Sequence, residues 1–324
     1  MTSLRILLVK TSSMGDVLHN LPVVSDLRAR FPDAEIDWLV EEVFAEIPRL
    51  HSEVREVLTV ALRRWRKRLF RGETWREARA FWRNLRAREY DVILDTQGLL
   101  KSAVLACAAR GARAGFSALS AREPIASRFY QIARDVPRDA HAITRNRQLA
   151  AAVFGYEISF APDYGVRLPR QENSQSVVFL TSSSKDSKLW PDTSWINLGR
   201  SLALCGLTAL LPSGSSLERR RATRIAEKIP GAQAIPAMNL ADLAALMAHA
   251  RFVVGVDTGL THLAAAVGTP TLALYTATSP ALTGVFGACW HRNLGGKGRI
   301  PNVRDALRAL AEFLPAEAEA FSGI

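Results

Sequence analysis

Apolar residues along the chain gather in short unbroken runs rich in Val, Ile and Leu, and these runs do not alternate with polar residues. Such runs are typical of parallel strands that are buried on both faces of a sheet. Between them lie stretches with the apolar spacing of a helix, including 17–30 and 74–87. The first half therefore predicts strands at Arg5–Val9, Ile36–Val40, Val54–Val60, Asp91–Asp95 and Ala114–Ser117.

The same pattern restarts near residue 176, again with apolar runs separated by helical spacing. A strand is predicted at Ser176–Ser184, ending in small hydroxyl residues. Further strands are predicted at 207–214, 232–236, 251–259 and 271–276, and helices at 195–204, 217–229, 240–250, 260–267 and 303–314.

The segment between the two sets, GYEISFAPDYGVRLPRQENSQ, is rich in Pro, Gly and polar residues and is interpreted as a linker. We therefore expect an α/β protein with two doubly wound, Rossmann-like domains, 1–170 and 171–324, facing across a cleft. The last helix is compatible with packing on either domain. Ligands of such domains bind at the carboxyl ends of the strands, so the loops after the strands hold the candidate chemistry.

The charge of the chain is uneven. Among 324 residues the formal net charge is +11, but the segment 63–86 alone holds ten Lys or Arg and two Glu. A patch of this kind implies an acidic partner: nucleic acid, an anionic membrane surface or a phosphorylated substrate. No apolar run is long enough to span a membrane, the N-terminus does not resemble a secretory signal, and three scattered cysteines fit neither a disulfide framework nor a zinc site. These features favour a cytoplasmic protein.

The loop KTSSMGD follows the first predicted strand and carries one acid, Asp16. Its spacing matches neither common phosphate-binding motif. A first-turn acid that caps the next helix is one interpretation of Asp16, and spacing alone favours it. The alternative is a general base that removes a proton from an incoming hydroxyl.

Two loops of the second half suit a diphosphate. In VVGVDTGLTH, the amides of Thr258 and Gly259 open a helix next to Asp257 and His262. In FLTSSSKDSKLWPDTSW, the hydroxyls of 182–184 precede Lys188. The competing interpretation is a capping acid or Thr, a surface His and a solvated Lys, with Trp190, Pro191 and Trp195 structural in either case.

Three further residues of the first half are candidates for the same sheet edge as Asp16. Gln97 and Lys101 lie in DTQGLLKSA, and Arg122 could bind a substrate carboxylate or pair with Glu123. The basic segment is interleaved with aromatic residues, a pattern that suits an anionic membrane surface, although a solvated amphipathic helix and nucleic-acid stacking are alternatives.

Seven segments taken together resemble the lipopolysaccharide heptosyltransferases, which are the ADP-heptose glycosyltransferases of family 9 with the GT-B fold. These segments are ILLVKTSSMGDVLHNLPVV, DWLVEEVFAEIP, RRWRK, YDVILDTQGLLKSA, AREPIASRFY, KLWP and VVGVDTGLTHLAAA. The form KTSSMGDVLH is similar to the first heptosyltransferase of that pathway rather than the second. The resemblance covers residues 5 to about 290.

The resemblance implies inverting transfer of L-glycero-D-manno-heptose from ADP-heptose to the first Kdo of Kdo2-lipid A, at the cytoplasmic face of the inner membrane. It makes Asp16 the general base. Because no acidic D-x-D pair stands in a position that demands a metal, we expect no obligatory metal or cofactor, and because no nucleic-acid module pattern is present we expect no nucleic acid. Where this chain has Ser183 and Ser184, the family often has Thr. The implied donor residues are Ser183, Ser184, Lys188, Glu218, Met238, Asp257, Thr258, Gly259 and His262, and the implied acceptor residues are Arg63, Lys67, Gln97, Lys101 and Arg122.

Three other functions stay open on the sequence: a related GT-B transferase that uses another nucleotide sugar or a later core acceptor, a basic nucleic-acid-binding protein, and a nucleotide sensor without catalysis.

Overall fold

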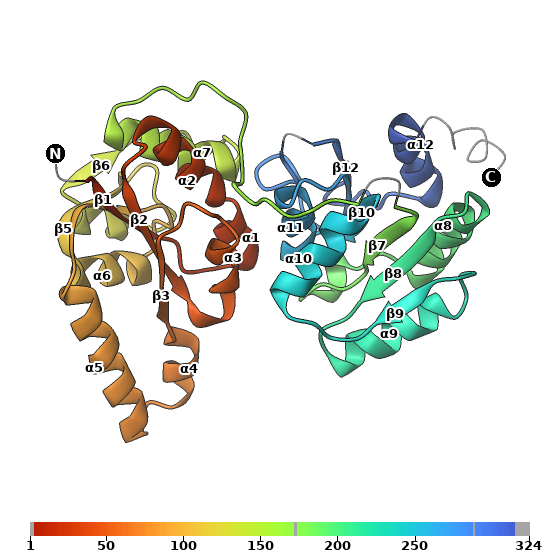
Figure 1. The fold of residues 1–324 in the computed structure, drawn as a ribbon, viewed down its shortest axis with the longest axis horizontal. Helices are drawn as coiled ribbons and strands as arrows, with labels where there is room; N and C mark the ends of the chain where they lie inside the picture. The colour runs from red at the N-terminus through yellow and green to blue at the C-terminus, as the bar shows by residue number, and fades with distance from the viewer. Residues whose placement is uncertain (1–2, 172–173, 288, 315–324) are drawn as a thin grey trace. The chain divides into compact units, whose positions relative to one another are not determined.

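A computed structural model describes residues 3–171, 174–287 and 289–314 (Figure 1). The contacts within the chain divide it between Gly165 and Val166 into two compact units. This division lies a few residues before the boundary expected from composition. Each unit has its own parallel sheet and its own core, as expected for two doubly wound domains.

The first unit is built on a six-stranded parallel sheet in the order β3-β2-β1-β4-β5-β6. This is the doubly wound order: β2 and β3 are added on one side of β1, and β4, β5 and β6 are added on the other side, so the order of the strands reverses between β1 and β4. β1 is fully buried from Ile6 onward because both of its faces carry helices. The strands are β1 (Arg5–Val9), β2 (Glu35–Glu41), β3 (Glu56–Val60), β4 (Glu89–Asp95), β5 (Arg110–Phe116) and β6 (Ile132–Arg134).

The helix expected at 17–30 is in fact two helices, α1 (Met14–Leu18) and α2 (Leu21–Arg30). Pro22 is the reason: it has no amide proton, and inside a continuous helix its ring would collide with the carbonyl of Leu18. As the second residue of α2 it is tolerated. The other helices of this unit are α3 (Glu46–Arg49), α4 (Leu62–Lys67), α5 (Gly72–Arg86), α6 (Leu100–Ala108) and α7 (Ala142–Phe154), with short 3-10 turns at Glu42–Phe44 and Pro124–Phe129.

α4 and α5 form a helical hairpin that extends away from the sheet of the first unit (Figure 1). Trp65 and Leu85 anchor its base in the core, where Phe81 and Trp82 pack against the same cluster. Trp75 lies on the same helix face as Trp82 and Leu85, yet its side chain is 64% exposed. The start of α5 therefore runs beyond the core that covers its later turns.

The second unit repeats the topology with the order β12-β11-β10-β7-β8-β9. The direction reverses between β7 and β10, the counterparts of β1 and β4. The strands are β7 (Ser176–Leu180), β8 (Thr208–Pro212), β9 (Gln233–Ile235), β10 (Phe252–Val256), β11 (Thr271–Tyr275) and β12 (His291–Gly295).

The helices of the second unit lie close to the ranges expected from apolar spacing. They are α8 (Asp192–Leu204), α9 (Ser216–Ala226), α10 (Leu240–His249), α11 (Gly259–Ala266) and α12 (Val303–Phe313), with a 3-10 turn at Asp186–Lys188. The last of them, α12, packs against α8, β11 and β12. Within the described chain, this contact ties the C-terminal helix to the second unit.

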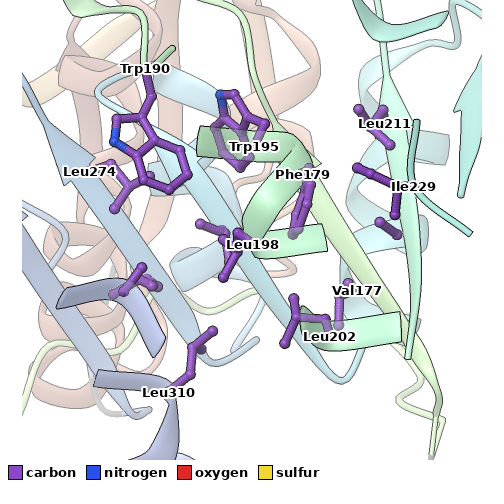
Figure 2. Close-up of a cluster of buried hydrophobic side chains, with 14 of the residues drawn as sticks. Val177, Phe179, Trp190, Trp195, Leu198, Leu202, Leu211, Ile229, Leu274 and Leu310 are labelled. Atoms are coloured by element: carbon purple, nitrogen blue, oxygen red, sulfur yellow. The ribbon is translucent and has the colours of Figure 1, made fainter. Parts of the chain in front are cut away.

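The core of the second unit includes two tryptophans, which Figure 2 shows among the buried side chains of this cluster. Trp190 and Trp195 are completely buried and meet edge to face with their ring centres 5.1 Å apart. The indole of Trp190 also donates a hydrogen bond to the carbonyl of Pro301 at 2.7 Å. Because Trp190 is fixed in this way, the preceding turn that carries Lys188 is held at the end of β7.

Candidate functional site

Polar side chains collect at the point where each sheet reverses its strand order, which is where doubly wound domains bind ligands. In the first unit they follow β1 and β4, and we call this group the first-unit edge, built from residues 10–16, 95–101 and Arg122. In the second unit they follow β7 and β10 and line a cavity that we call the second-unit pocket. The two groups are described separately.

Asp16 occupies the first turn of α1, where its Oδ2 accepts hydrogen bonds from the amide and the hydroxyl of Ser13, both at 3.0 Å. The capping interpretation is therefore correct as far as it goes. Arg122 lies 3.5 Å from the same oxygen. Among the described residues no contact to the other carboxylate oxygen, Oδ1, is recorded, so the capping role leaves Oδ1 for a ligand.

Lys10 is the cation that sets the electrostatics of this edge. Its ammonium is buried and donates to the carbonyl of Thr96 at 2.7 Å and to Oδ1 of Asn146 at 3.4 Å. Burial lowers the pKa of Lys10 to about 8 against the opposing pull of Asp16 and Asp95.

Asp16 experiences the reciprocal effect. Burial alone raises its pKa, but the charge of Lys10, the amide of Ser13 and the charge of Arg122 together bring the pKa below its ordinary value. The carboxylate is therefore ionised at neutral pH and ready to accept a proton.

Gln97 is buried and holds the loop after β1 rather than facing solvent. Its Oε1 accepts from the amide and the hydroxyl of Thr11, at 2.7 and 2.8 Å. The neighbouring carboxylate of Asp95 is also fully used, since it accepts from the amide of Gln97 and from the hydroxyl of Tyr130. Burial raises the pKa of Asp95. The carboxylate of Asp95 therefore has a structural role at this edge, whereas Asp16 keeps one carboxylate oxygen, Oδ1, for a ligand.

Two predicted acceptor cations belong to this edge. Lys101 donates to the hydroxyl of Ser12 at 2.8 Å, and partial burial together with the charge of Arg63 lowers the pKa of Lys101. Arg122 contacts Asp16, with a guanidinium nitrogen 3.5 Å from its Oδ2, whereas Oε2 of Glu123 accepts from the amide of Leu100 at 2.7 Å.

The other two acceptor cations lie on α4. Arg63 is exposed, with its guanidinium 5.0 Å from the centre of the Phe44 ring. Its charge reaches Lys101. Lys67 is exposed at the end of α4, and within the described part of the chain it makes no contact with Asp16. Arg63 therefore lies close enough to the first-unit edge to affect Lys101, whereas Lys67 lies further along the hairpin, at the end of α4.

The second-unit pocket has a volume of about 250 Å³ and lies at the carboxyl ends of β7, β8 and β10. One part of its wall is hydroxyl-rich and another is apolar, so it suits a ligand with both a polar and a flat apolar portion. Five of the predicted donor residues line it. The lining is Leu180, Thr181, Ser182, Ser183, Ser184, Pro212, Ser213, Gly214, Glu218, Met238, Leu243, Thr258 and Leu260.

Lys188 is held at this edge by an ion pair, with its Nζ 2.6 Å from Oδ2 of Asp257. The hydroxyl of Ser183 donates to the carbonyl of Asp257 at 3.2 Å, which joins the loops after β7 and β10. Thr276 fixes the same turn from the other side by donating to the carbonyl of Ser187. Lys188 is therefore a positioned cation rather than a solvated surface lysine.

The remaining donor candidates have local structural roles as well. Glu218 accepts from the amides of Gly214 and Ser215 at 2.9 and 2.8 Å and so caps α9. Gly259 begins α11 after Thr258, leaving the first amides of that helix directed toward the end of β10. His262 is buried one turn into α11, away from the pocket lining.

Sequence reasoning missed several residues of both groups. Lys10 is the most important; its only signal was a charge at the first position after a buried strand. Tyr130 also escaped notice because it lies 35 positions from its partner Asp95. The apolar wall of the pocket, Leu180, Leu243 and Leu260, has no signal in the sequence that distinguishes it from core.

Among residues 3–171, 174–287 and 289–314, no group of three or more His, Cys, Asp or Glu side chains has the arrangement of a metal site. Within the same ranges, none of the helices has the length and apolar character needed to cross a bilayer. Cys107, Cys205 and Cys289 are free thiols, and Cys107 is exposed on α6.

Comparison with known sequences identifies relatives. Residues 78–304 match the family profile of glycosyltransferase family 9 (heptosyltransferase). Lipopolysaccharide heptosyltransferase 1 of Escherichia coli K12 is 41% identical over 292 residues, covering 88% of this chain and 91% of that protein. The protein of the same name from Pseudomonas aeruginosa PAO1 is 43% identical over 292 residues, covering 88% and 82%.

Solved structures agree. The E. coli heptosyltransferase WaaC with ADP superimposes with a TM-score of 0.89 at 38% identity, covering 97% of this chain and all of that one. WaaC with ADP-2-deoxy-2-fluoro heptose gives a TM-score of 0.87. E. coli heptosyltransferase II, at 20% identity and a TM-score of 0.76, shares the fold. Two doubly wound units, a matching family profile and relatives above 40% identity lead to one conclusion: the chain is a GT-B glycosyltransferase and belongs to family 9, the heptosyltransferases.

Proposed function

We propose that this chain transfers L-glycero-D-manno-heptose from ADP-heptose to the first Kdo sugar of Kdo2-lipid A, with inversion at the anomeric carbon. The acceptor oxygen forms a bond to that carbon as the bond to the β-phosphate oxygen breaks, ADP leaves, and the hydroxyl proton passes to a base. The observation that carries the proposal is the hydroxyl-lined second-unit pocket, in a chain similar to a solved enzyme that holds ADP.

On the acceptor side the proposed base is Asp16. Its carboxylate is ionised at neutral pH, and the contacts of Ser13 and Arg122 are both made to Oδ2 rather than Oδ1. Arg122 now pairs with Asp16, but it is also the cation best placed to bind a sugar carboxylate. When the Kdo carboxylate takes Arg122, Asp16 loses part of its stabilising charge and its pKa rises. Acceptor binding would thereby strengthen the base at the moment it is needed.

On the donor side the pocket offers each part of ADP a suitable wall. Met238, Leu243 and Leu260 present an apolar surface for the adenine, and Ser183, Ser184 and Thr258 present hydroxyls for the polar part. The first amides of α11 and the charge of Lys188 stabilise the diphosphate that leaves, so the proposed mechanism needs no obligatory metal or cofactor. His262, buried on α11, is not given a direct role in holding the donor.

The proposed acceptor also gives the basic hairpin a role. Kdo2-lipid A is an anionic membrane lipid. We propose that Arg63 and Lys67 bind acceptor phosphates and carboxylates, and that the enzyme works at the cytoplasmic surface of the inner membrane.

The decisive experiment is a transfer assay with ADP-heptose and Kdo2-lipid A, with and without a chelator. We expect turnover that survives chelation and a product with inverted anomeric configuration. ADP- and UDP-linked sugars other than heptose, and a core acceptor that already carries heptose, are the matched controls. Faster transfer with any of these would replace the proposal by a related transferase with another donor or a later acceptor.

A nucleic-acid-binding function is the alternative from another class, and the charge of segment 63–86 is its one supporting observation. A filter-binding assay with duplex and single-stranded DNA separates it from transfer. Tight, salt-sensitive DNA binding without sugar transfer would favour this alternative. Normal turnover by Asp16→Ala would instead remove the proposed mechanism while keeping the enzyme.

A further inference from the structure

The end of the α4–α5 hairpin combines exposed apolar side chains with unpaired cations. We call residues 66–76 the hairpin tip. Phe70 is fully exposed, and Leu69 and Trp75 are 49% and 64% exposed. Exposed large apolar side chains that cluster within a few residues are unusual on a protein surface and mark a contact with an apolar partner.

The tip is a turn closed by side-chain hydrogen bonds, and it exposes these apolar side chains. The indole of Trp75 donates to the carbonyl of Leu69, and the hydroxyl of Thr74 donates to the carbonyl of Arg68, both at 2.8 Å. These bonds close the connection between α4 and α5, so the backbone around Phe70 is fixed while its ring points to solvent. In Figure 1 this turn lies at the far end of the hairpin from the sheet of its own unit.

The tip carries a large excess of positive charge. Glu77, just beyond it, accepts from Arg64 and from the indole of Trp65, so its charge is used at the base of the hairpin. Glu73 is the single acid within 66–76. Five cations of the tip make no ion pair recorded among the described residues: Arg66, Lys67, Arg68, Arg71 and Arg76.

We infer that the hairpin tip inserts Leu69, Phe70 and Trp75 into the interface of an anionic bilayer while the surrounding cations bind lipid phosphates. Aromatic and aliphatic side chains ringed by Lys and Arg are what the headgroup region accommodates, with Trp at the polar boundary and long cationic stems reaching phosphates. A nucleic acid would engage the cations and could stack bases on Phe70 or Trp75, but it offers no apolar interior for the aliphatic side chain of Leu69 to enter. The inference rests on the proposed function for its purpose, delivery of a lipid acceptor, but its test does not.

The test is co-sedimentation of the full chain with vesicles of phosphatidylethanolamine and phosphatidylglycerol. We expect the double substitution Leu69→Ser/Phe70→Ser to weaken binding on the order of tenfold or more, since the apolar area no longer leaves water. Leu204→Ser is the matched control, because Leu204 is 79% exposed on the other unit. That control should bind like the unsubstituted chain. Brominated lipids should quench less of the total tryptophan fluorescence in Trp75→Phe.

Several results would overturn the inference. They are vesicle binding unaffected by Leu69→Ser/Phe70→Ser, equal loss in the Leu204→Ser control, no binding by the unsubstituted chain, or a change of oligomeric state caused by the double substitution. Binding abolished by Arg66→Glu/Arg68→Glu/Arg71→Glu but untouched by the apolar pair would reduce the tip to a charged surface and overturn insertion.

Transfer to a fully deacylated, water-soluble acceptor separates this inference from the proposed function. The double variant should keep normal turnover there, which also shows that it is folded. If even the unsubstituted chain fails to transfer heptose to that acceptor or to Kdo2-lipid A, the proposed function fails, whereas the vesicle result stands by itself.

Discussion

The first-unit edge and the second-unit pocket lie at equivalent positions of two sheets with the same topology, yet they are built from different kinds of side chain. The first-unit edge is a network of buried or half-buried charges, in which Lys10 and Asp16 shift each other's pKa and the charge of Asp95 also acts on Lys10. The second-unit pocket is a cavity of about 250 Å³ lined mainly by hydroxyl and apolar side chains, with one ion pair beside it. One topology thus supports two kinds of chemistry.

The difference follows from what each group is proposed to do. Proton transfer needs a group whose pKa is tuned, and burial among charges is how a protein tunes it. Holding a nucleotide needs space, donors and an apolar wall, and a dense charge network would fill that space. Substitutions in the first-unit edge should therefore change kcat and its pH dependence, and substitutions around the second-unit pocket should change the KM for the donor.

The largest effect is expected for Asp16→Asn. It removes the proposed base while the side-chain carbonyl can still accept from Ser13, so the helix cap is kept. We expect kcat to fall by about 10²- to 10⁴-fold with an unchanged KM for ADP-heptose. Asp139→Asn, at an exposed acid of the same unit, is the control and should keep full activity. A large rise in donor KM in Asp16→Asn would break the division between the two groups.

Lys188→Ala should affect the donor. Loss of a charge-assisted contact to the diphosphate corresponds to about 1.5–3 kcal/mol, or roughly 10- to 150-fold in the KM for ADP-heptose. The KM for the acceptor should stay the same. Lys185→Ala, three residues earlier and exposed, provides the matched control. Steady-state kinetics with each substrate varied in turn gives both constants, and equal losses for both substrates would contradict this assignment.

Charge reversal on α4, Arg63→Glu/Lys67→Glu, should raise the KM for Kdo2-lipid A several-fold and leave the donor KM unchanged. The effect should shrink as salt is added, because exposed charges are screened within about 10 Å at 0.1 M ionic strength. Arg304→Glu reverses an exposed charge on the second unit and serves as the control. An effect that is independent of salt would point to a structural role for these residues.

The smallest effect is a displacement of the pH profile in Lys10→Met. Lys10 lowers the pKa of Asp16, so removing its charge raises that pKa. The acidic limb of kcat/KM should therefore move to higher pH. In the unsubstituted chain Lys10 itself loses its proton as pH rises through about 8, and this step should be absent from the variant.

Two further variants test whether the charge of Lys10 sets the pKa of Asp16. Lys10→Arg keeps the charge and should retain the original acidic limb. Arg122→Met should move the limb less than Lys10→Met does, since Arg122 is a weaker influence on Asp16. An unmoved profile in Lys10→Met would show that Asp16 is not the group that titrates in catalysis.

Most of the fold was predictable from the sequence because buried parallel strands are continuous apolar runs. β1 has the predicted bounds, and β2, β4, β7 and β10 fall where such runs occur. β6 and β12 were missed because they read IAR and HRNLG, which carry too few apolar residues to form a run. Pro22 was a readable signal that a helix over 17–30 must break, and its effect was underestimated.

The candidate site was predictable only in part. Ser183, Thr258 and Lys188 could be placed because each follows a predicted strand, and topology brings those strand ends together. The partners of Asp16 could not be derived, since spacing says nothing about a buried cation such as Lys10 or about Arg122 arriving from a distant loop. The capping and the proposed catalytic roles were treated as rivals, whereas the two oxygens of one carboxylate allow both.

The central position of β1 affects the order in which the protein can assemble during synthesis. Ile6 pairs with Ile36 on one side and with Val92 on the other, so the earliest strand to leave the ribosome waits for β4 before its second edge is covered. β7 waits in the same way for β10, since Val177 pairs with Phe252. Each half-paired strand is an open template for another nascent chain. Translation speed through residues 10–90 and 181–250 should therefore influence the yield of soluble enzyme.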